Sequence, residues 1–248
     1  MCTHCGCSAE KASLTDLHTL EQSTFSVAAD PTTVKMQHAL LSGNDEIAAQ
    51  NRQLFARQEI TCINLMGTPG AGKTRLLEAL LQSGIEQFAG LRVFEGDQES
   101  ANDAKRIVQA GGKALQINTG VGCHLDAEMI KQGLSRFEHF HRAPLVVENV
   151  GNLVCPALFD LGETLRIAMM AVTDGDDKPV KYPHIFSQCD LVIINKVDLL
   201  AHVDFDMHKV RHDLSHLNPK AEVIELSAKT GEGLPQLVDW LDARGAHG

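Results

Sequence analysis

The segment with the clearest chemistry is a glycine-rich octapeptide, Gly67-Thr68-Pro69-Gly70-Ala71-Gly72-Lys73-Thr74. Its spacing satisfies G-x-x-x-x-G-K-[ST], a pattern in which backbone N–H groups and the N-terminus of the next helix face a diphosphate. Lys73 is expected to reach the β- and γ-phosphates, and the Thr74 hydroxyl to coordinate Mg²⁺. The sequence therefore predicts a nucleoside triphosphate site. We expect its phosphate contacts to come from Gly67, Gly70, Ala71, Gly72, Lys73, Thr74 and Arg75.

A second element, Asn195-Lys196-Val197-Asp198, indicates which base is bound. The Asp198 carboxylate can accept hydrogen bonds from the ring N–H and the exocyclic amine of guanine, and adenine has neither donor at that place. Hydrogen bonds of this charge-assisted kind contribute about 1.5–3 kcal/mol each. The Lys196 stem would cover the base, and Ser227-Ala228-Lys229 matches the loop whose backbone contacts the guanine oxygen. Together with the phosphate loop, these elements predict GTP.

Two acidic residues stand where the γ-phosphate would be sensed, and with Lys73 they are the catalytic candidates. Asp97 closes the segment Glu95-Gly96-Asp97, and we expect it to hold Mg²⁺ or to orient the attacking water. Glu148 opens Glu148-Asn149-Val150-Gly151, where many GTPases have D-x-x-G, so its role in holding Mg²⁺ is left open. Either acid could instead be an ordinary carboxylate at a strand end. Gly151 is expected to contact the γ-phosphate.

Two cysteines and a histidine form a candidate metal site. Cys123-His124 follows the third predicted strand and Cys155 follows the fourth. In a parallel sheet both loops emerge at the carboxyl ends of the strands, so these side chains can converge. Two thiolates and an imidazole suit Zn²⁺ in a tetrahedral arrangement, or Ni²⁺ in a planar one with one added ligand. The alternative is that both cysteines are small buried core residues.

The amino-terminal motif Cys2-x-x-Cys5-Gly-Cys7 predicts a second metal site. If Met1 is removed, the free amine joins three thiolates, a set of four ligands that suits square-planar Ni²⁺. The alternative is a disordered reducing tail. Cys62 and Cys189 lie inside and just before apolar runs, and we expect both to be packing residues.

The elements that must position these residues alternate between strand and helix. Buried strands are predicted at 62–66, 91–94, 114–117, 145–147, 167–172, 191–194 and 223–226, and helices at 73–81, 101–109, 127–137, 206–216 and 234–241. This order predicts an α/β fold of three layers, a P-loop NTPase fold with a mostly parallel central sheet covered by helices on both faces. We expect a flexible cysteine-containing tail at residues 1–34, a helical segment at 35–60 interrupted near Ser42-Gly43-Asn44, and a GTPase domain at 61–248.

Composition restricts the partners and the compartment. The formal net charge is −10, and the basic residues are scattered, which argues against nucleic acid as a partner. The chain has no apolar run of the roughly 18 residues that a membrane span needs and no signal peptide, so we expect a cytoplasmic protein without membrane contact. Seven cysteines in such a protein are expected to stay reduced.

These motifs resemble the nickel-incorporation GTPases of [NiFe]-hydrogenase maturation, the hydrogenase nickel incorporation protein B family of SIMIBI-class P-loop GTPases. The resemblance covers nearly the whole chain. It rests on the terminal C-x-x-C-G-C, the phosphate loop, Glu95–Gln98, Thr119–Asp126, Glu148–Pro156, Lys181–His184 and Asn195–Asp198. A histidine-rich tract found in some relatives is missing, so bulk nickel storage is not expected.

The resemblance implies a slow GTPase that dimerises with nucleotide or metal and passes nickel to the hydrogenase large subunit with a small zinc-binding maturation protein. The family's metal ligands correspond to Cys123, His124 and Cys155 in the GTPase domain and to Cys2, Cys5 and Cys7 at the terminus. Two alternatives stay open: a sister metallochaperone GTPase for urease or for a zinc or cobalt pathway, and a metal-responsive GTP-binding adaptor with negligible turnover.

Overall fold

The structure, a computed structural model, describes residues 10–15, 22–27, 31–89, 91–97, 100–120, 124–136 and 144–245. The chain divides into two compact units, residues 1–44 and 45–248. In the smaller unit, β1 (Glu10–Thr15) pairs antiparallel with β2 (Gln22–Val27). No regular elements were predicted in residues 1–34, so this hairpin is a correction.

A single helix, α1 (Pro31–Arg57), crosses the boundary between the units. The predicted interruption at residues 42–44 is therefore wrong. A glycine inside a helix costs about 1 kcal/mol relative to alanine, which one residue of a long helix can absorb. Gly43 also has open space around it, because a methyl group added there would meet nothing within 4 Å. The predicted domain division at residues 34 and 60 stays a prediction.

The larger unit is built on a seven-stranded sheet in the order β5-β4-β6-β3-β7-β8-β9, and every pair of neighbours is parallel. All seven predicted strands are present. They are β3 (Cys62–Gly67), β4 (Arg92–Asp97), β5 (Lys113–Asn118), β6 (Leu145–Glu148), β7 (Leu165–Ala171), β8 (Leu191–Asn195) and β9 (Glu222–Glu225).

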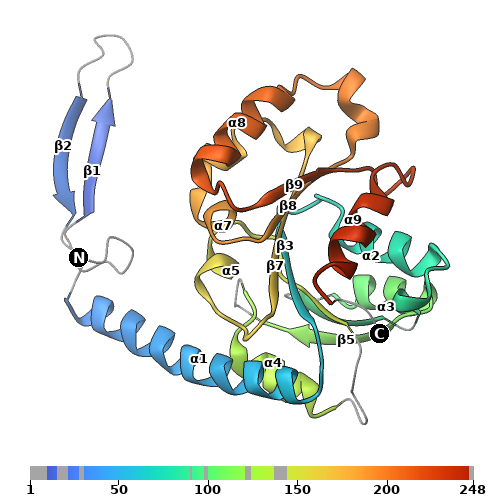
Figure 1. Ribbon diagram of the computed structural model, residues 1–248. Helices are drawn as coiled ribbons and strands as arrows, with labels where there is room; N and C mark the ends of the chain where they lie inside the picture. The colour runs from blue at the N-terminus through green and yellow to red at the C-terminus, as the bar shows by residue number, and fades with distance from the viewer. Residues whose placement is uncertain are drawn as a thin grey trace. The chain divides into compact units, whose positions relative to one another are not determined.

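Helices cover both faces of this sheet and make three layers (Figure 1). One face packs against α2 (Lys73–Gln82), α3 (Asn102–Gln109) and α9 (Leu234–Asp242). The other packs against α1, α4 (Ala127–Leu134), α5 (Cys155–Leu158), α7 (Pro183–Ser187) and α8 (Met207–Leu217). Short segments complete the chain: α6 (Lys178–Lys181) and the 3₁₀ turns η1 (Glu86–Phe88), η2 (Val172–Asp174) and η3 (Val197–His202).

The two faces follow from alternation along each strand. In β3, Ile63 and Leu65 point to the core under α2, whereas Cys62 and Met66 point to the cores on the opposite face. Because side chains alternate along a strand, a run that is apolar at every position can be buried on both faces. Cys62 and Cys189 are buried as predicted, and burial raises the pKa of both thiols, that of Cys189 to about 12.

The second half of α1 belongs to the core of the larger unit. Ala48, Asn51 and Phe55 form its buried face. The Asn51 side chain donates hydrogen bonds to the carbonyl oxygens of Ala127 at 2.8 Å and Leu161 at 3.1 Å. This helix is therefore fixed against α4 and the segment that precedes β7.

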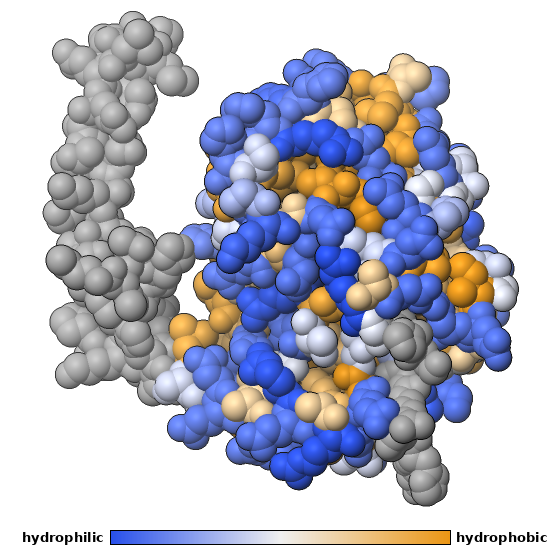
Figure 2. Space-filling view, viewed as in Figure 1, coloured by the Kyte–Doolittle hydropathy of each residue, from blue (hydrophilic) through white to orange (hydrophobic). Residues whose placement is uncertain are grey.

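The described surface is mainly polar. Hydrophilic side chains dominate the face drawn in Figure 2, with separate apolar patches between them. Among the described residues, no helix has the length and hydrophobicity that crossing a membrane would require.

We expect Gly162→Ala to destabilise the larger unit by about 2 kcal/mol or more. Gly162 has a φ of +86°, and a methyl group there would lie 2.5 Å from the carbonyl oxygen of Ala48 and 2.7 Å from Cβ of Asn51. The substitution therefore adds backbone strain and pushes α1 off the domain. Urea unfolding measures the loss. Gly43→Ala is the matched control, expected to match wild type or exceed it slightly, and equal midpoints for Gly162→Ala and wild type would contradict the packing described.

Candidate nucleotide and metal site

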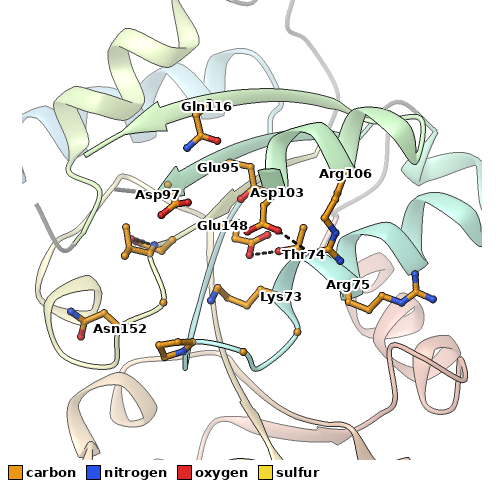
Figure 3. Close-up of a pocket in the computed structure, with 17 residues that line it drawn as sticks. Lys73, Thr74, Arg75, Glu95, Asp97, Asp103, Arg106, Gln116, Glu148 and Asn152 are labelled. Atoms are coloured by element: carbon orange, nitrogen blue, oxygen red, sulfur yellow. Dashed lines mark hydrogen bonds and ion pairs between the residues drawn. The ribbon is translucent and has the colours of Figure 1, made fainter. Parts of the chain in front are cut away.

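A pocket of about 500 Å³ opens where β3, β4 and β6 end (Figure 3). In an open α/β sheet, the carboxyl ends of the strands are the usual place for a ligand. The pocket brings together most of the predicted phosphate-loop and catalytic residues. Those that line it are Gly70, Gly72, Lys73, Thr74, Arg75, Asp97, Glu148 and Gly151.

The backbone of the phosphate loop adopts a conformation that depends on its glycines. Gly72 precedes α2 with a φ of +95°, and a methyl group there would lie 2.6 Å from Nδ2 of Asn195. That nitrogen donates a hydrogen bond to the carbonyl oxygen of the buried Ala71 at 2.7 Å. Gly67 ends β3, directly before the loop. The phosphate loop and the candidate base element are thus joined by a direct hydrogen bond.

The hydroxyl of Thr74 donates a hydrogen bond to Oε1 of Glu148 at 2.9 Å. Both side chains are buried, and Lys73 beside them is 7% exposed. A carboxylate that accepts from the hydroxyl of the phosphate loop is placed to hold the same cation as that hydroxyl. Glu148 therefore reaches the Thr74 hydroxyl directly, and its role in holding Mg²⁺ stays a prediction.

Polar side chains on three neighbouring strands, β6, β4 and β5, form a row that begins at Glu148. Glu95 of β4 is in register with Glu148 of β6 on one side and with Gln116 of β5 on the other. Oε1 of Glu95, Oε2 of Glu148 and both amide atoms of Gln116 are buried, with no hydrogen-bond partner among the described residues. Buried polar atoms without partners are costly in a protein interior, so these four atoms are candidates for contact with a ligand or ion.

The two carboxyl groups of this row resist ionisation. Burial, reinforced by the neighbouring Glu148, raises the pKa of Glu95 to about 10. Burial also raises the pKa of Glu148, while the positive charge of Lys73 acts in the opposite direction. A cation in the pocket would oppose the same raised pKa values.

Several residues that line the pocket with the predicted acids were not predicted as site residues, among them Glu95, Asp103 and Gln116. A signal for Glu95 was present, because an acidic residue directly after the buried run Val93-Phe94 is costly without a function. Asp103 and Gln116 gave no such signal, since a polar residue on a helix or an edge strand is ordinary. Asp97 accepts a hydrogen bond from the Ser100 hydroxyl at 2.8 Å and faces the pocket (Figure 3).

The predicted base element forms a connected group at the ends of β8 and β9. Asn195 Oδ1 accepts a hydrogen bond from the backbone of Ala228 at 3.0 Å. The Ser227 hydroxyl donates to Oδ1 of Asp198 at 2.6 Å, and Lys229 lies 3.9 Å from the other oxygen of that carboxylate. Lys196 has a φ of +63° and its Nζ donates to the Thr173 hydroxyl at 3.5 Å. The Asp198 carboxylate is thus held in one orientation.

Two of the candidate metal residues, His124 and Cys155, are described, and both lie in segments that follow strands of the sheet, β5 and β6. Cys155 is partly exposed and opens α5, four residues after Gly151. The ring of His124 stacks on Phe159, directly after α5, with 3.8 Å between ring centroids. Burial lowers the pKa of His124, and the nearby Asp126 opposes this. A neutral imidazole is the form that binds a metal.

Part of the predicted metal ligand set falls outside the described residues. Cys2, Cys5, Cys7 and Cys123 belong to that part, so the convergence of Cys123 with His124 and Cys155 stays a prediction. Within the described ranges, no three side chains of His, Cys, Asp or Glu form a cluster that could hold a metal ion. What the structure adds is that the segment carrying His124 packs against the end of α5, the helix that Cys155 begins.

Comparison with known protein families shows which family this chain belongs to. Residues 61–225 match the CobW/HypB/UreG nucleotide-binding domain. The hydrogenase maturation factor HypB of Rhizobium leguminosarum is 43% identical over 213 residues, which cover 86% of this chain and 71% of the relative. This chain belongs to the HypB family. HypB of Escherichia coli K12 is 45% identical over 205 residues, covering 83% and 70% of the two chains.

Solved HypB structures agree with the fold. HypB from Archaeoglobus fulgidus superposes with a TM-score of 0.76 at 40% identity, covering 83% of this chain and all of that one. HypB from Helicobacter pylori, solved in complex with nickel, superposes with a TM-score of 0.77 at 34% identity, covering 82% and 95%. The predicted P-loop fold with a parallel sheet between helices is therefore confirmed.

For this HypB-family chain we expect Asp198→Ala to weaken GTP binding by roughly two to four orders of magnitude. Two charge-assisted hydrogen bonds of about 1.5–3 kcal/mol each would be lost. Isothermal titration with GTP and ATP measures the change, and the preference for GTP over ATP is expected to fall with it. Asp204→Ala, a change in the loop before α8, is the control. An unchanged GTP affinity in Asp198→Ala would place the base elsewhere.

Proposed function

We propose that this chain is a GTP-hydrolysing metallochaperone that delivers nickel to the large subunit of a [NiFe]-hydrogenase. The observation that supports the proposal is that one short loop connects the nucleotide pocket to a candidate metal ligand. Gly151 lines the nucleotide pocket, and four residues later Cys155 begins α5, whose far end packs on His124. A movement of this loop on GTP hydrolysis would shift one metal ligand against the others, so the nucleotide state would set the metal affinity.

The residues of the pocket divide the work of hydrolysis. Lys73 binds the β- and γ-phosphates, and Asn195, Lys196 and Asp198 bind the guanine. Thr74, Asp97 and Glu148 fit Mg²⁺, because the Thr74 hydroxyl meets one oxygen of Glu148, the other oxygen of that carboxyl is buried without a described partner, and Asp97 lines the same pocket. When bound there, Mg²⁺ would neutralise charge on the phosphate oxygens.

Asp97 orients the water that attacks the γ-phosphorus. As the new P–O bond forms, the bond to the β–γ bridging oxygen breaks, and GDP leaves. The proton of the water passes to the released phosphate. With no catalytic glutamine after Gly151, turnover is slow, and dimerisation raises it.

The cargo sites divide into two sets. Cys123, His124 and Cys155 bind Ni²⁺ or Zn²⁺ in the GTPase domain, and Cys155 follows the loop that responds to the nucleotide. Cys2, Cys5 and Cys7 bind Ni²⁺ with the terminal amine. The first set offers two thiolates and an imidazole, and the second offers three thiolates and an amine, all donors that suit these ions.

A second copy of the chain and two other proteins are the proposed partners. Four large apolar side chains are exposed in the described part of the chain, and three of them lie in or next to α5 and α6: Val154, Leu158 and Val180. An apolar surface beside Cys155 supports a homodimer in which nucleotide and metal lie near the interface. The hydrogenase large subunit receives nickel with the help of a small zinc-binding maturation protein, in the cytoplasm.

Nickel transfer to the apo large subunit tests the proposal. The full chain is loaded with Ni²⁺ and incubated with the apo large subunit and either GTP or a non-hydrolysable analogue, and nickel in the separated large subunit is counted. We expect transfer that depends on hydrolysis. Equal transfer with GTP and with the analogue would contradict the proposal. Phosphate release limited to one turnover would favour the alternative, a metal-responsive GTP-binding adaptor.

One observation favours a second recipient. A relative from Helicobacter hepaticus, 36% identical over 217 residues, is a hydrogenase/urease maturation factor HypB. The same transfer measurement with apo-urease in place of the hydrogenase subunit separates the two recipients.

A further inference from the structure

Asn149, the first residue after β6, holds two loops through a single atom. Its Oδ1 accepts hydrogen bonds from the backbone N–H groups of Val150 at 3.0 Å and Leu125 at 3.2 Å. Val150 belongs to the nucleotide loop, residues 149–152, which lines the pocket. Leu125 directly follows His124 in the described part of the metal loop, residues 124–126. Asn149 itself is 1% exposed, so water does not compete for these bonds.

A buried chain of hydrogen bonds fixes the orientation of this amide. Both loops offer N–H donors, so the oxygen must face them, and Nδ2 donates to Oδ1 of Asn64 at 3.3 Å. Asn64 in turn donates to Oε1 of Glu163 at 3.2 Å. That oxygen also accepts from Nε of Arg166 at 2.6 Å, which keeps it an acceptor. This series of hydrogen bonds has N–H donors at one end and a carboxylate acceptor at the other. Neither the Asn149 amide nor the Asn64 amide can therefore flip without losing a hydrogen bond.

We propose that Asn149 is a positioning residue that couples the nucleotide loop to the metal loop. This proposal rests on the proposed function, and it names Asn149 as the residue that transmits a change of bound nucleotide to the metal loop. When Gly151 moves with the γ-phosphate, Val150 moves with it. Because the same oxygen holds Leu125 and the amide cannot turn freely, the N–H of Leu125 follows, and His124 shifts relative to Cys155.

The first test follows the Leu125 amide in the wild-type full chain without metal. Hydrogen exchange is measured with GDP and with a non-hydrolysable GTP analogue. We expect the protection of Leu125 to differ between the two states by a factor on the order of 5–150, the range of ordinary coupling. Equal protection in both states would overturn the proposal.

The second test measures the nickel affinity of the GTPase-domain site in both nucleotide states, in a Cys2/Cys5/Cys7→Ala background. The quantity is the ratio of the two dissociation constants for the unaltered loop and for Asn149→Ala. We expect the ratio to fall to about 1 in Asn149→Ala, because the link is cut. The matched control is Asn218→Ala. Its amide nitrogen donates to two backbone carbonyls, those of Phe186 at 3.1 Å and Cys189 at 2.8 Å, so this variant too loses two bonds between an amide side chain and the backbone, away from both loops.

The two tests separate this proposal from the proposed function. If Asn149→Ala keeps the ratio of the control, the coupling runs by another route and the proposal is wrong, while the proposed function stands. If Leu125 responds to nucleotide but nickel affinity does not, Asn149 still links the loops, and the proposed function fails instead.

Discussion

Replacing Lys73 with alanine is expected to lower kcat/KM for GTP hydrolysis by a factor on the order of 10³. Three cationic side chains line the pocket, and two of them are engaged: Arg75 and Arg106 both pair with Glu78, at 3.3 Å and 2.8 Å. Lys73, among the described residues, donates only to the Thr68 carbonyl at 3.5 Å. It is therefore the charge in this pocket that is ready to meet a triphosphate.

The acidic lining makes the loss of Lys73 severe. The carboxylates of Asp97 and Asp103 line the same pocket, and without Lys73 they would repel GTP. Phosphate release under multiple turnover measures the change, and GTP titration separates binding from catalysis. Lys105→Ala on the exposed side of α3 is the control and keeps the wild-type rate. A Lys73→Ala variant with more than about a tenth of wild-type activity would contradict the assignment of this pocket.

Replacing Cys155 with alanine is expected to weaken nickel binding at the GTPase-domain site by a factor on the order of 10² or more. Metal sites with four ligands bind with about 10–16 kcal/mol, so one ligand accounts for roughly a quarter of that. The measurement is competition with a chelator in a Cys2/Cys5/Cys7→Ala background. In this background the amino-terminal thiolates do not bind the metal.

Cys189→Ala is the matched control for the loss of a thiol. Cys189 is buried and its thiol has a pKa of about 12, so it carries no thiolate at neutral pH. Its removal leaves nickel affinity unchanged. If Cys155→Ala binds nickel as tightly as Cys189→Ala, then Cys155 is not a ligand, and His124 lies beside α5 for packing alone.

The fold could be predicted from the sequence because most of the strands contain a short apolar run. Burial on both faces leaves little choice of structure for segments such as Leu191–Asn195. The phosphate loop and the base element were found by residue type and spacing, and Asn195 and Ala71 meet as those motifs require. Sequence reasoning failed at α1, where it gave a glycine more weight than the helical residues on either side.

Contacts between distant residues could not be predicted. Glu95 and Glu148 become a pair because β4 and β6 are neighbours in the sheet, and the order of the strands is not written in any local pattern. Likewise, the hydrogen bond between Asn149 and Leu125 joins residues from two separate loops. Motifs identify the residues that touch a ligand, whereas the residues that hold them depend on tertiary packing.

The central claim is that GTP controls the nickel affinity of one site in this chain. The most direct measurement is nickel affinity, by chelator competition, for the wild type and for Cys2/Cys5/Cys7→Ala and Cys123/Cys155→Ala variants, each with GDP and with a GTP analogue. We predict two separable sites, of which only the one lost in Cys123/Cys155→Ala responds to the nucleotide. The same nickel affinity in both nucleotide states, or nickel binding that survives the loss of all five cysteines, would contradict the account.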